Sequence, residues 1–272
     1  MPELPEVEVT RLGMMPLLGK KVSEVTIRHA TLRWPIPQHL NHSLPNQSLR
    51  AIKRRAKYIL CEFDTGILLL HLGMSGRICL LDRFYPPEKH DHFDVQFVDG
   101  TVLRLRDPRR FGAVLWLTPQ ESTQHSLLNT LGPEPLTPDF HAQYLLQLLR
   151  NKSQAIKNAI MDSHLVVGVG NIYASESLFR AKIHPETPAK ALDLAMCERL
   201  VAEIKATLQA ALNAGGSSLR NFFGADGNPG YFQQSYYVYA RTNQPCKACH
   251  ALIQCIRLGQ RSTFYCPNCQ PK

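Results

Sequence analysis

The sequence Cys246-Lys247-Ala248-Cys249, followed later by Cys266-Pro267-Asn268-Cys269, contains two Cys-x2-Cys pairs with sixteen residues between them. This spacing is typical of a zinc ribbon, in which each pair forms a tight knuckle and two knuckles supply four thiolates in a tetrahedron. Two disulfides are the alternative, but a chain that stays in the cytosol disfavours them. Cys255 and His250 are further candidate ligands, although neither completes a knuckle. The spacing therefore predicts one structural zinc ion, held by Cys246, Cys249, Cys266 and Cys269.

The residues between the two knuckles are expected to form a β-hairpin. Residues 251–257 and 262–266 can pair across the segment 258–261, and zinc would then tie the open end of the hairpin. Arg257 and Arg261 would lie near its tip. We expect this module to occupy residues 235–272.

Upstream of the module, the apolar residues recur with a helical period. A row at i, i+4 spacing ends at Asn213–Gly216. The row consists of Leu192, Met196, Leu200, Ile204, Leu208 and Leu212. The proline- and glycine-containing stretch 131–135 marks a boundary with the part of the chain before it. We expect a helical domain over residues 134–234.

The first part of the chain has the patterns of β-structure. The apolar runs 58–63 and 67–72 flank Asp64-Thr65-Gly66, which is typical of a hairpin. Over residues 103–106 leucines alternate with arginines, which predicts a half-buried sheet with a basic outer face. A short helix should begin the chain, with Pro5 in its first turn and Pro16 limiting its end. The expected fold is α+β and multidomain, with a β-sandwich-like domain and a flanking helix over residues 1–133.

Composition and charge indicate the class of partner. Of the 272 residues, 44% are hydrophobic and 19% charged, as in ordinary globular proteins, and the net charge is +9. No acidic residue follows Asp226, and basic clusters occupy residues 50–57 and 104–110. Basic surfaces bind phosphate backbones by releasing counterions, so we favour nucleic acid over a merely solvated basic surface.

The chain lacks the features of an exported or membrane-bound protein. It has no apolar run long enough for a membrane span. Its first 30 residues carry Glu3, Glu6 and Glu8 and contain no apolar signal core. We therefore expect a cytosolic protein.

The N-terminus contains a candidate nucleophile. Removal of Met1 would leave Pro2 with a free secondary amine, and terminal amines have a reference pKa of about 7.7–8.0. Such an amine can attack the C1′ carbon of a sugar and form an iminium ion. Glu3 could move protons beside it. Taken alone, these residues also suit a plain helix start.

Several further motifs occur in order along the whole chain. They are Met1-Pro2-Glu3-Leu4-Pro5-Glu6-Val7-Glu8, Arg54-Arg55-Ala56-Lys57-Tyr58, His71-Leu72-Gly73-Met74-Ser75-Gly76, Lys89-His90-Asp91-His92, Asp107-Pro108-Arg109-Arg110-Phe111-Gly112, Val167-Gly168-Val169-Gly170-Asn171-Ile172-Tyr173-Ala174-Ser175-Glu176 and Gln260-Arg261-Ser262-Thr263-Phe264-Tyr265-Cys266. Together with the zinc ribbon, they resemble the bacterial formamidopyrimidine-DNA glycosylases. The resemblance implies a bifunctional glycosylase and AP lyase that excises oxidised purines, such as 8-oxoguanine and formamidopyrimidines, from damaged double-stranded DNA.

The resemblance also implies catalytic roles. Pro2 would be the Schiff-base nucleophile, and Glu3 the acid that acts on the deoxyribose. Lys57 would transfer protons during β-elimination, and Arg261 would assist δ-elimination. Cations near the leaving phosphate oxygens favour these steps electrostatically.

DNA contacts follow from the same resemblance. Met74, Arg109 and Phe111 would fill the space left by the extruded nucleotide, with Arg109 facing the orphaned cytosine. His90, Lys152, Lys157 and Asn171 would lie near the DNA strand, the last three on a helix–two-turns–helix element in the helical domain. Asn171 is also a candidate helix cap. The segment 217–230 is similar to the family's lesion-covering loop.

Two alternatives remain open from the sequence. An endonuclease VIII-type glycosylase would prefer oxidised pyrimidines, although the N-terminal motif and the set Met74, Arg109 and Phe111 favour the purine-directed branch. A non-enzymatic zinc-ribbon DNA-binding protein would need neither the Pro2-Glu3 terminus nor Lys57. We expect a monomer that binds duplex DNA, with no membrane partner, in the bacterial cytoplasm in association with the nucleoid.

Overall fold

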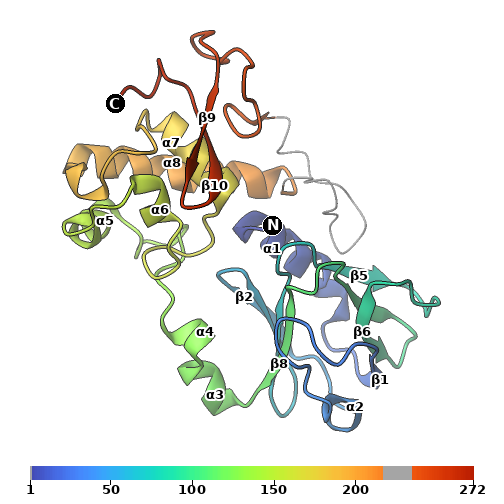
Figure 1. Cartoon of the computed structure of the whole chain (residues 1–272). Helices are drawn as coiled ribbons and strands as arrows, with labels where there is room; N and C mark the ends of the chain where they lie inside the picture. The colour runs from blue at the N-terminus through green and yellow to red at the C-terminus, as the bar shows by residue number, and fades with distance from the viewer. Residues whose placement is uncertain (1, 217–234) are drawn as a thin grey trace. The chain divides into compact units, whose positions relative to one another are not determined.

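The computed structural model describes residues 2–216 and 235–272, and the chain divides into two compact units (Figure 1). The first unit comprises Met1–Asn129 and Ala214–Tyr231, and the second comprises Thr130–Asn213 and Phe232–Lys272. The predicted lesion-covering loop, 217–230, lies outside the described residues. Within the described residues, every helix is too short or too polar to cross a bilayer.

The first unit contains two four-stranded antiparallel sheets. One has the order β1-β6-β7-β5 and the other the order β2-β3-β4-β8. The strands are β1 (Val22–Ile27), β2 (Ala51–Arg55), β3 (Tyr58–Glu62), β4 (Ile67–His71), β5 (Arg77–Leu81), β6 (Asp91–Phe97), β7 (Val102–Arg106) and β8 (Ala113–Leu117). The helices are α1 (Leu4–Gly13), the 3-10 helix η1 (Met15–Leu17), α2 (Leu40–Ser43), α3 (Pro119–Gln124) and α4 (Ser126–Asn129).

One apolar core joins the two sheets. It draws buried side chains from both, such as Ile59 and Leu70 of one sheet and Phe93 and Leu105 of the other. Two layers of sheet around one core are a sandwich, as the sequence predicted. The predicted hairpin is also confirmed, because β3 and β4 pair antiparallel with Glu62 opposite Ile67.

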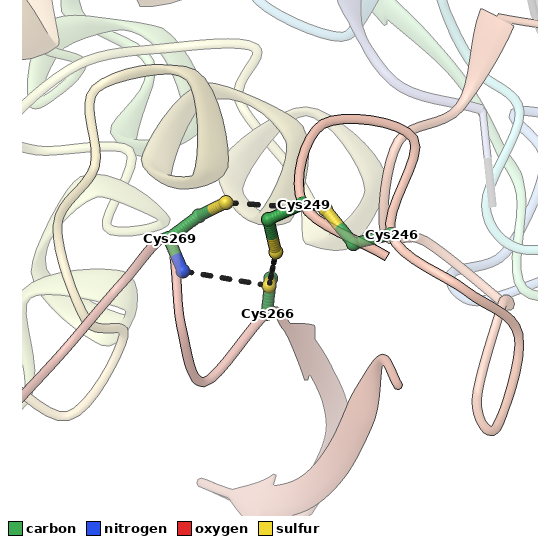
Figure 2. Close-up of side chains that lie close together, drawn as sticks. All are labelled: Cys246, Cys249, Cys266 and Cys269. Carbon is green, nitrogen blue, oxygen red and sulfur yellow. Dashed lines mark hydrogen bonds between the residues drawn. The ribbon is translucent and has the colours of Figure 1, made fainter. Parts of the chain in front are cut away.

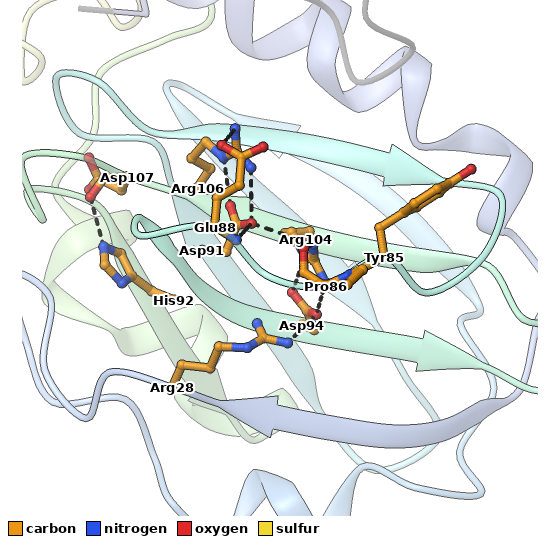
Figure 3. Close-up of polar contacts among 10 residues, drawn as sticks. All are labelled: Arg28, Tyr85, Pro86, Glu88, Asp91, His92, Asp94, Arg104, Arg106 and Asp107. Atoms are coloured by element: carbon orange, nitrogen blue, oxygen red, sulfur yellow. Dashed lines mark hydrogen bonds and ion pairs between the residues drawn. The ribbon is translucent and has the colours of Figure 1, made fainter.

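The predicted basic outer face of β7 is wrong. Arg104 is 3% exposed, because the loop before β6 covers it and the carbonyl oxygen of Tyr85 accepts a hydrogen bond from its guanidinium at 2.8 Å. Asp94 of the neighbouring strand pairs with it at 2.8 Å, and Asp91 pairs with Arg106 at 2.6 Å (Figure 3). A second arginine, Arg28, which directly follows β1, lies 2.6 Å from Asp94. The alternation therefore reflects a buried ion network rather than a solvated face.

The second unit consists of helices and a two-stranded hairpin. The helices are α5 (Ala142–Leu149), α6 (Ile156–Ile160), α7 (Asn171–Arg180), the 3-10 helix η2 (Ala189–Ala191) and α8 (Leu194–Asn213), and the hairpin strands are β9 (Gln254–Leu258) and β10 (Arg261–Tyr265). The apolar row predicted for a helix lies on α8, except that Leu192 precedes the helix. Leu200, Ile204 and Leu208 of this row are fully buried.

Helix α7 anchors the C-terminal part of this unit. The carboxylate of Glu176 accepts hydrogen bonds from the backbone amides of Tyr237, Val238 and Tyr239 at 2.8–2.9 Å. At the other end of the module, the side-chain amide of Gln270 donates to the carbonyl oxygen of Ile183 at 2.8 Å. Because Glu176 and Gln270 are both fully buried, these polar contacts fix the ribbon on the helix without competition from water.

The ion network yields a test of stability. Asp94→Asn should reduce the free energy of unfolding by about 3–5 kcal/mol, because Arg104 would stay buried without its nearest carboxylate and would keep only the longer pair with Asp91. The matched control is Lys53→Met, which removes the exposed Lys53–Glu62 pair and should have little effect. Urea unfolding of both variants measures the difference, and equal losses would contradict the burial argument.

Candidate functional site

The four paired cysteines come together in the second unit (Figure 2). Their sulfur atoms all lie within 4.8 Å of one another, with Cys246 and Cys269 at 3.9 Å and Cys249 and Cys266 at 3.4 Å. Four thiolates at the usual zinc–sulfur distance of about 2.3 Å would lie roughly 3.8 Å apart, so the set fits a tetrahedral zinc site. Cys255, in contrast, is exposed on β9.

Hydrogen bonds to sulfur favour the thiolate form of Cys249, whereas burial raises the pKa of Cys266 and of Cys269. The backbone amide of Ala248 donates to the sulfur of Cys246, and that of Cys269 to the sulfur of Cys266, each at 3.4 Å. Hydrogen bonds from the Asn268 side chain and the Ala251 amide lower the pKa of Cys249 to about 6. Thiolates are the form that binds zinc.

The hairpin between the knuckles presents Arg261. Its turn is formed by Gly259 and Gln260, whose φ angles of 52° and 63° suit a two-residue turn between twisted strands. Next to the turn, each strand therefore extends one residue further than predicted, and Leu258 pairs directly with Arg261. As a result, Arg261 is exposed at the start of β10.

The hairpin is held by Lys157 of α6, whose side chain is fully buried. Its ammonium group donates to Thr263 Oγ1 at 2.7 Å, to the Ser262 carbonyl oxygen at 3.3 Å and to Asn171 Oδ1. The amide of Asn171 also donates to the Ser262 carbonyl oxygen, at 2.9 Å. The helix cap is Gly170 rather than Asn171, because Asn171 is already the first helical residue. Lys152, on the loop before α6, is half-buried.

In the first unit, Pro2 and Glu3 lie directly before α1. Both are buried, and Glu3 is only 2% exposed. Glu3 is the N-cap residue, and its backbone amide donates to the carboxylate of Glu6 at 2.9 Å. Pro5 lies in the first turn, as predicted. These contacts fix the backbone that carries the proposed nucleophile.

Lys57 is half-buried in the two-residue turn between β2 and β3. The preceding residue, Ala56, has a φ angle of 55°, which is uncommon outside glycine. Arg54 donates to the Ala56 carbonyl oxygen at 3.0 Å and pairs with Glu8 of α1 at 2.9 Å. Burial alone would raise the pKa of Glu8, but the Arg11 and Arg54 guanidiniums hold this pKa below its usual value. An ion pair thus ties the lysine turn to the helix that follows Pro2.

Met74, Arg109 and Phe111 occupy two neighbouring loops of the first unit. They are termed here the void-filling residues, after the role that the sequence resemblance predicts for them. All three side chains are exposed, Met74 by 41% and Phe111 by 47%. The Arg109 guanidinium lies 4.7 Å from the centre of the Phe111 ring, a cation–π contact. The structure therefore brings a cation and two apolar side chains to one part of the surface.

Two histidines flank these loops. His71, the last residue of β4, accepts a hydrogen bond on Nδ1 from the Gly73 amide at 3.1 Å, and its ring lies 5.0 Å from that of Tyr58. Burial, with smaller contributions from the charges of Lys57 and Arg33, lowers the pKa of His71 to about 4. The other histidine, His90, is half-buried just before β6.

The predicted site residues are distributed over both units. The first unit holds Pro2, Glu3, Lys57, Met74, His90, Arg109 and Phe111, and the second holds Lys152, Lys157, Asn171, Arg261 and the four cysteines. Sequence reasoning did not single out the residues that hold them, which are the buried Glu6, Asp107 and Glu176 and the half-buried Arg54 and Ser75. Only the helix-start spacing of Glu3 and Glu6 could have indicated one of them.

Family models match three consecutive parts of the chain. Residues 1–114 match the formamidopyrimidine-DNA glycosylase N-terminal domain, residues 131–222 the formamidopyrimidine-DNA glycosylase H2TH domain, and residues 243–272 the zinc finger found in FPG and IleRS. A protein from Methylobacillus flagellatus named formamidopyrimidine-DNA glycosylase is 64% identical over 270 residues, which cover 99% of this chain and 96% of that protein.

Solved structures of a Lactococcus lactis protein are also similar. A mutant of that glycosylase in complex with DNA containing Fapy-dG is 34% identical, with a TM-score of 0.93 and full coverage of both chains. Its complex with DNA containing an abasic site has the same identity and TM-score, and covers 99% of this chain and all of the other. The predicted α+β fold, with a β-sheet domain, a helical domain and a zinc finger, is therefore confirmed.

The zinc ligands can be tested by single substitutions. Cys246→Ser should lose bound zinc, because a structural site of this size needs all four thiolates. Cys255→Ser, on the adjacent strand, is the matched control and should keep the metal. Zinc content measured on the purified variants separates the two, and equal loss in both would reject the ligand set.

His71 gives a test of pH dependence. Its pKa is about 4 in the folded chain and 6.5 as the ordinary value, so the unfolded chain binds more protons between these two pH values. Proton binding by His71 in the unfolded chain therefore lowers the free energy of unfolding as the pH falls from about 6.5 to about 4. His71→Gln should lose less stability than the wild type between pH 7 and pH 4.5 in urea unfolding. The same pH dependence in both proteins would contradict this assignment.

Proposed function

Because the chain belongs to the formamidopyrimidine-DNA glycosylase family, we propose that it excises oxidised purines from duplex DNA and then cleaves the strand from its N-terminal proline. The chain is a DNA glycosylase, and AP lyase activity is typical of its family. The observation that carries the proposal is the buried Pro2-Glu3 backbone at the head of α1, within a chain that matches all three family domains in order.

In the proposed reaction, Met1 is removed and the Pro2 nitrogen uses its lone pair to form a bond to C1′. The bond from C1′ to the damaged base breaks, and the base leaves with the proton lost from the amine. Glu3 protonates the ring oxygen O4′ as the sugar opens, which leaves a C1′=N⁺ iminium ion. Glu3 is the residue next to Pro2 in the chain, so it would act close to the reacting sugar.

The iminium ion then permits two eliminations. Loss of a proton from C2′ expels the phosphate at C3′, and Lys57 is proposed to transfer this proton. Loss of a proton from C4′ then expels the phosphate at C5′, assisted by Arg261. The exposed position of Arg261 and the half-exposed position of Lys57 support access to a DNA strand, and fixed cations stabilise the departing phosphates.

Recognition of the lesion is assigned to the void-filling residues. An excised base has to leave the helical stack, and apolar side chains with an arginine can occupy the space that it leaves. Arg109 is proposed to face the orphaned cytosine, whose O2 and N3 atoms accept hydrogen bonds. We further propose that His90, Lys152, Lys157 and Asn171 lie near the DNA strand. For Lys157 and Asn171 the support is indirect, because both bind the backbone next to Arg261.

The metal and the partners follow from the same family. We propose one structural zinc ion at the four paired cysteines, where the metal would fix the hairpin that carries Arg261. We also propose a monomer that acts on damaged DNA of the bacterial nucleoid, with domains at residues 1–133, 134–234 and 235–272. The L. lactis complexes with damaged DNA support the choice of partner.

Of the two alternatives, only one remains to be tested. A non-enzymatic DNA-binding protein is not supported, because the 64% identical relative is named as a glycosylase. An enzyme that prefers oxidised pyrimidines would cleave duplex with such a lesion faster than duplex with 8-oxoguanine. Single-turnover cleavage of both duplexes by this protein decides between them.

The nucleophile is tested at the N-terminus. Pro2→Gly should greatly weaken strand cleavage and borohydride trapping on 8-oxoguanine duplex, and retention of Met1 should abolish both, since the secondary amine would be lost. Normal trapping by protein that retains Met1 would reject Pro2 as the nucleophile.

Glu3→Gln should suppress base release and leave binding of the duplex largely intact. Glu24→Gln, an exposed site on β1, is the matched control for Glu3.

A further inference from the structure

The void-filling residues are exposed, so their own packing does not hold them in place. Met74 lies on the loop that follows β4, whereas Arg109 and Phe111 lie on the loop between β7 and β8. A side chain inserted into DNA has to keep its position while the stack pushes against it. Both loops therefore need a fixed backbone and a fixed separation.

The carboxylate of Asp107 fixes both the backbone of these loops and their separation. Asp107 is fully buried, and its Oδ1 accepts from Ser75 Oγ at 2.7 Å, while its Oδ2 accepts from the Gly112 amide at 2.8 Å. The Arg109 amide points to the same place and lies 3.1 Å from Ser75 Oγ and 3.3 Å from Asp107 Oδ1. The Asp107 side chain thus binds one loop through Ser75 and spans the other loop from end to end.

Close backbone packing makes the arrangement specific. Gly73 has a φ angle of +60°, and a Cβ atom added there would lie 2.3 Å from the backbone carbon of Phe111. A Cβ atom added to Gly112 would lie 2.7 Å from the carbonyl oxygen of His71. The two loops therefore touch backbone to backbone. The loop between β7 and β8 is also fixed where it begins, because the ring of His92 forms a hydrogen bond with the carbonyl oxygen of Asp107 at 2.9 Å (Figure 3).

We infer that Asp107 and Ser75 are positioning residues that hold Met74, Arg109 and Phe111 as one rigid group for insertion into the DNA. This inference rests on the proposed function of the void-filling residues. Charge-assisted hydrogen bonds from a buried carboxylate to backbone amides fix the loops before DNA binds, so less conformational entropy is lost when the helix is opened. Recognition of the opposite base by the Arg109 side chain then depends on the hydrogen bonds that Asp107 makes to the backbone of the same loop.

The experiment compares excision of 8-oxoguanine opposite cytosine and opposite adenine under single-turnover conditions. Ser75→Ala and Asp107→Asn should slow excision opposite cytosine by about tenfold or more, the effect expected for a lost charge-assisted hydrogen bond. They should also narrow the cytosine-to-adenine ratio of excision rates, as is expected of Arg109→Ala. Ser75→Thr keeps the hydroxyl and should restore the ratio. Asp64→Asn is the matched control, since Asp64 also accepts a backbone amide, that of Ser48, but away from these loops.

A double-mutant cycle separates positioning from general stability. If Asp107 acts through Arg109, then Asp107→Asn should not change the ratio further in the Arg109→Ala background. An unchanged ratio in Arg109→Ala alone would instead reject the proposed role of the void-filling residues. A narrowed ratio in Arg109→Ala, with a wild-type ratio in both Ser75→Ala and Asp107→Asn, would overturn the positioning role only. Should Asp107→Asn fail to fold, Ser75→Ala and Ser75→Thr decide the question.

Discussion

The buried carboxylate of Glu176 accepts hydrogen bonds from three consecutive backbone amides, and the position of the whole zinc ribbon depends on these hydrogen bonds. Burying a charge is unfavourable unless hydrogen bonds replace the lost water, so a fully buried glutamate is retained only where its partners have fixed positions. The three amides of residues 237–239 meet that condition. The position of the ribbon on α7 is thereby set before any DNA is bound, and Lys157 repeats the arrangement with the opposite charge at Ser262 and Thr263.

The first unit uses the same arrangement at each place where a side chain has to act. Glu6 holds the amide of Glu3, Arg54 holds the carbonyl oxygen of Ala56 beside Lys57, and Asp107 holds both void-filling loops. In each case a charged group binds the backbone near a proposed site residue, and Asp107 also reaches the Met74 loop through the Ser75 hydroxyl. The backbone of each proposed site residue is thereby held by another residue, whether the site residue is buried, as Glu3 is, or exposed, as Arg109 is. Positioning is thus carried out by residues other than those proposed to act on the DNA.

The sequence predicted the features that have a local period or spacing, but not those that depend on distant pairs. The hairpin of β3 and β4, the row on α8 and the four cysteines all follow from residues close together in the chain. The outward position assigned to Arg104 was wrong, because the alternation of a strand does not reveal that the loop before β6 covers its second face. Similarly, Ser75 and Asp107 are 32 residues apart, and neither motif indicates the other. The domain boundaries and the roles of the site residues stay predictions.

The backbone next to the working residues shows how rigidity is obtained. Ala56 precedes Lys57, Arg110 lies between Arg109 and Phe111, and Gln260 precedes Arg261; all three have φ angles of 55–63°. A residue with a side chain costs about 1–2 kcal/mol in this region, and glycine would avoid that strain. Glycine would also give the unfolded loop more freedom, and it would let the turn relax when DNA pushes on it. Hydrogen bonds such as that from Arg54 to Ala56 offset the strain, so these turns combine an unfavourable local conformation with a fixed direction for the side chain that follows.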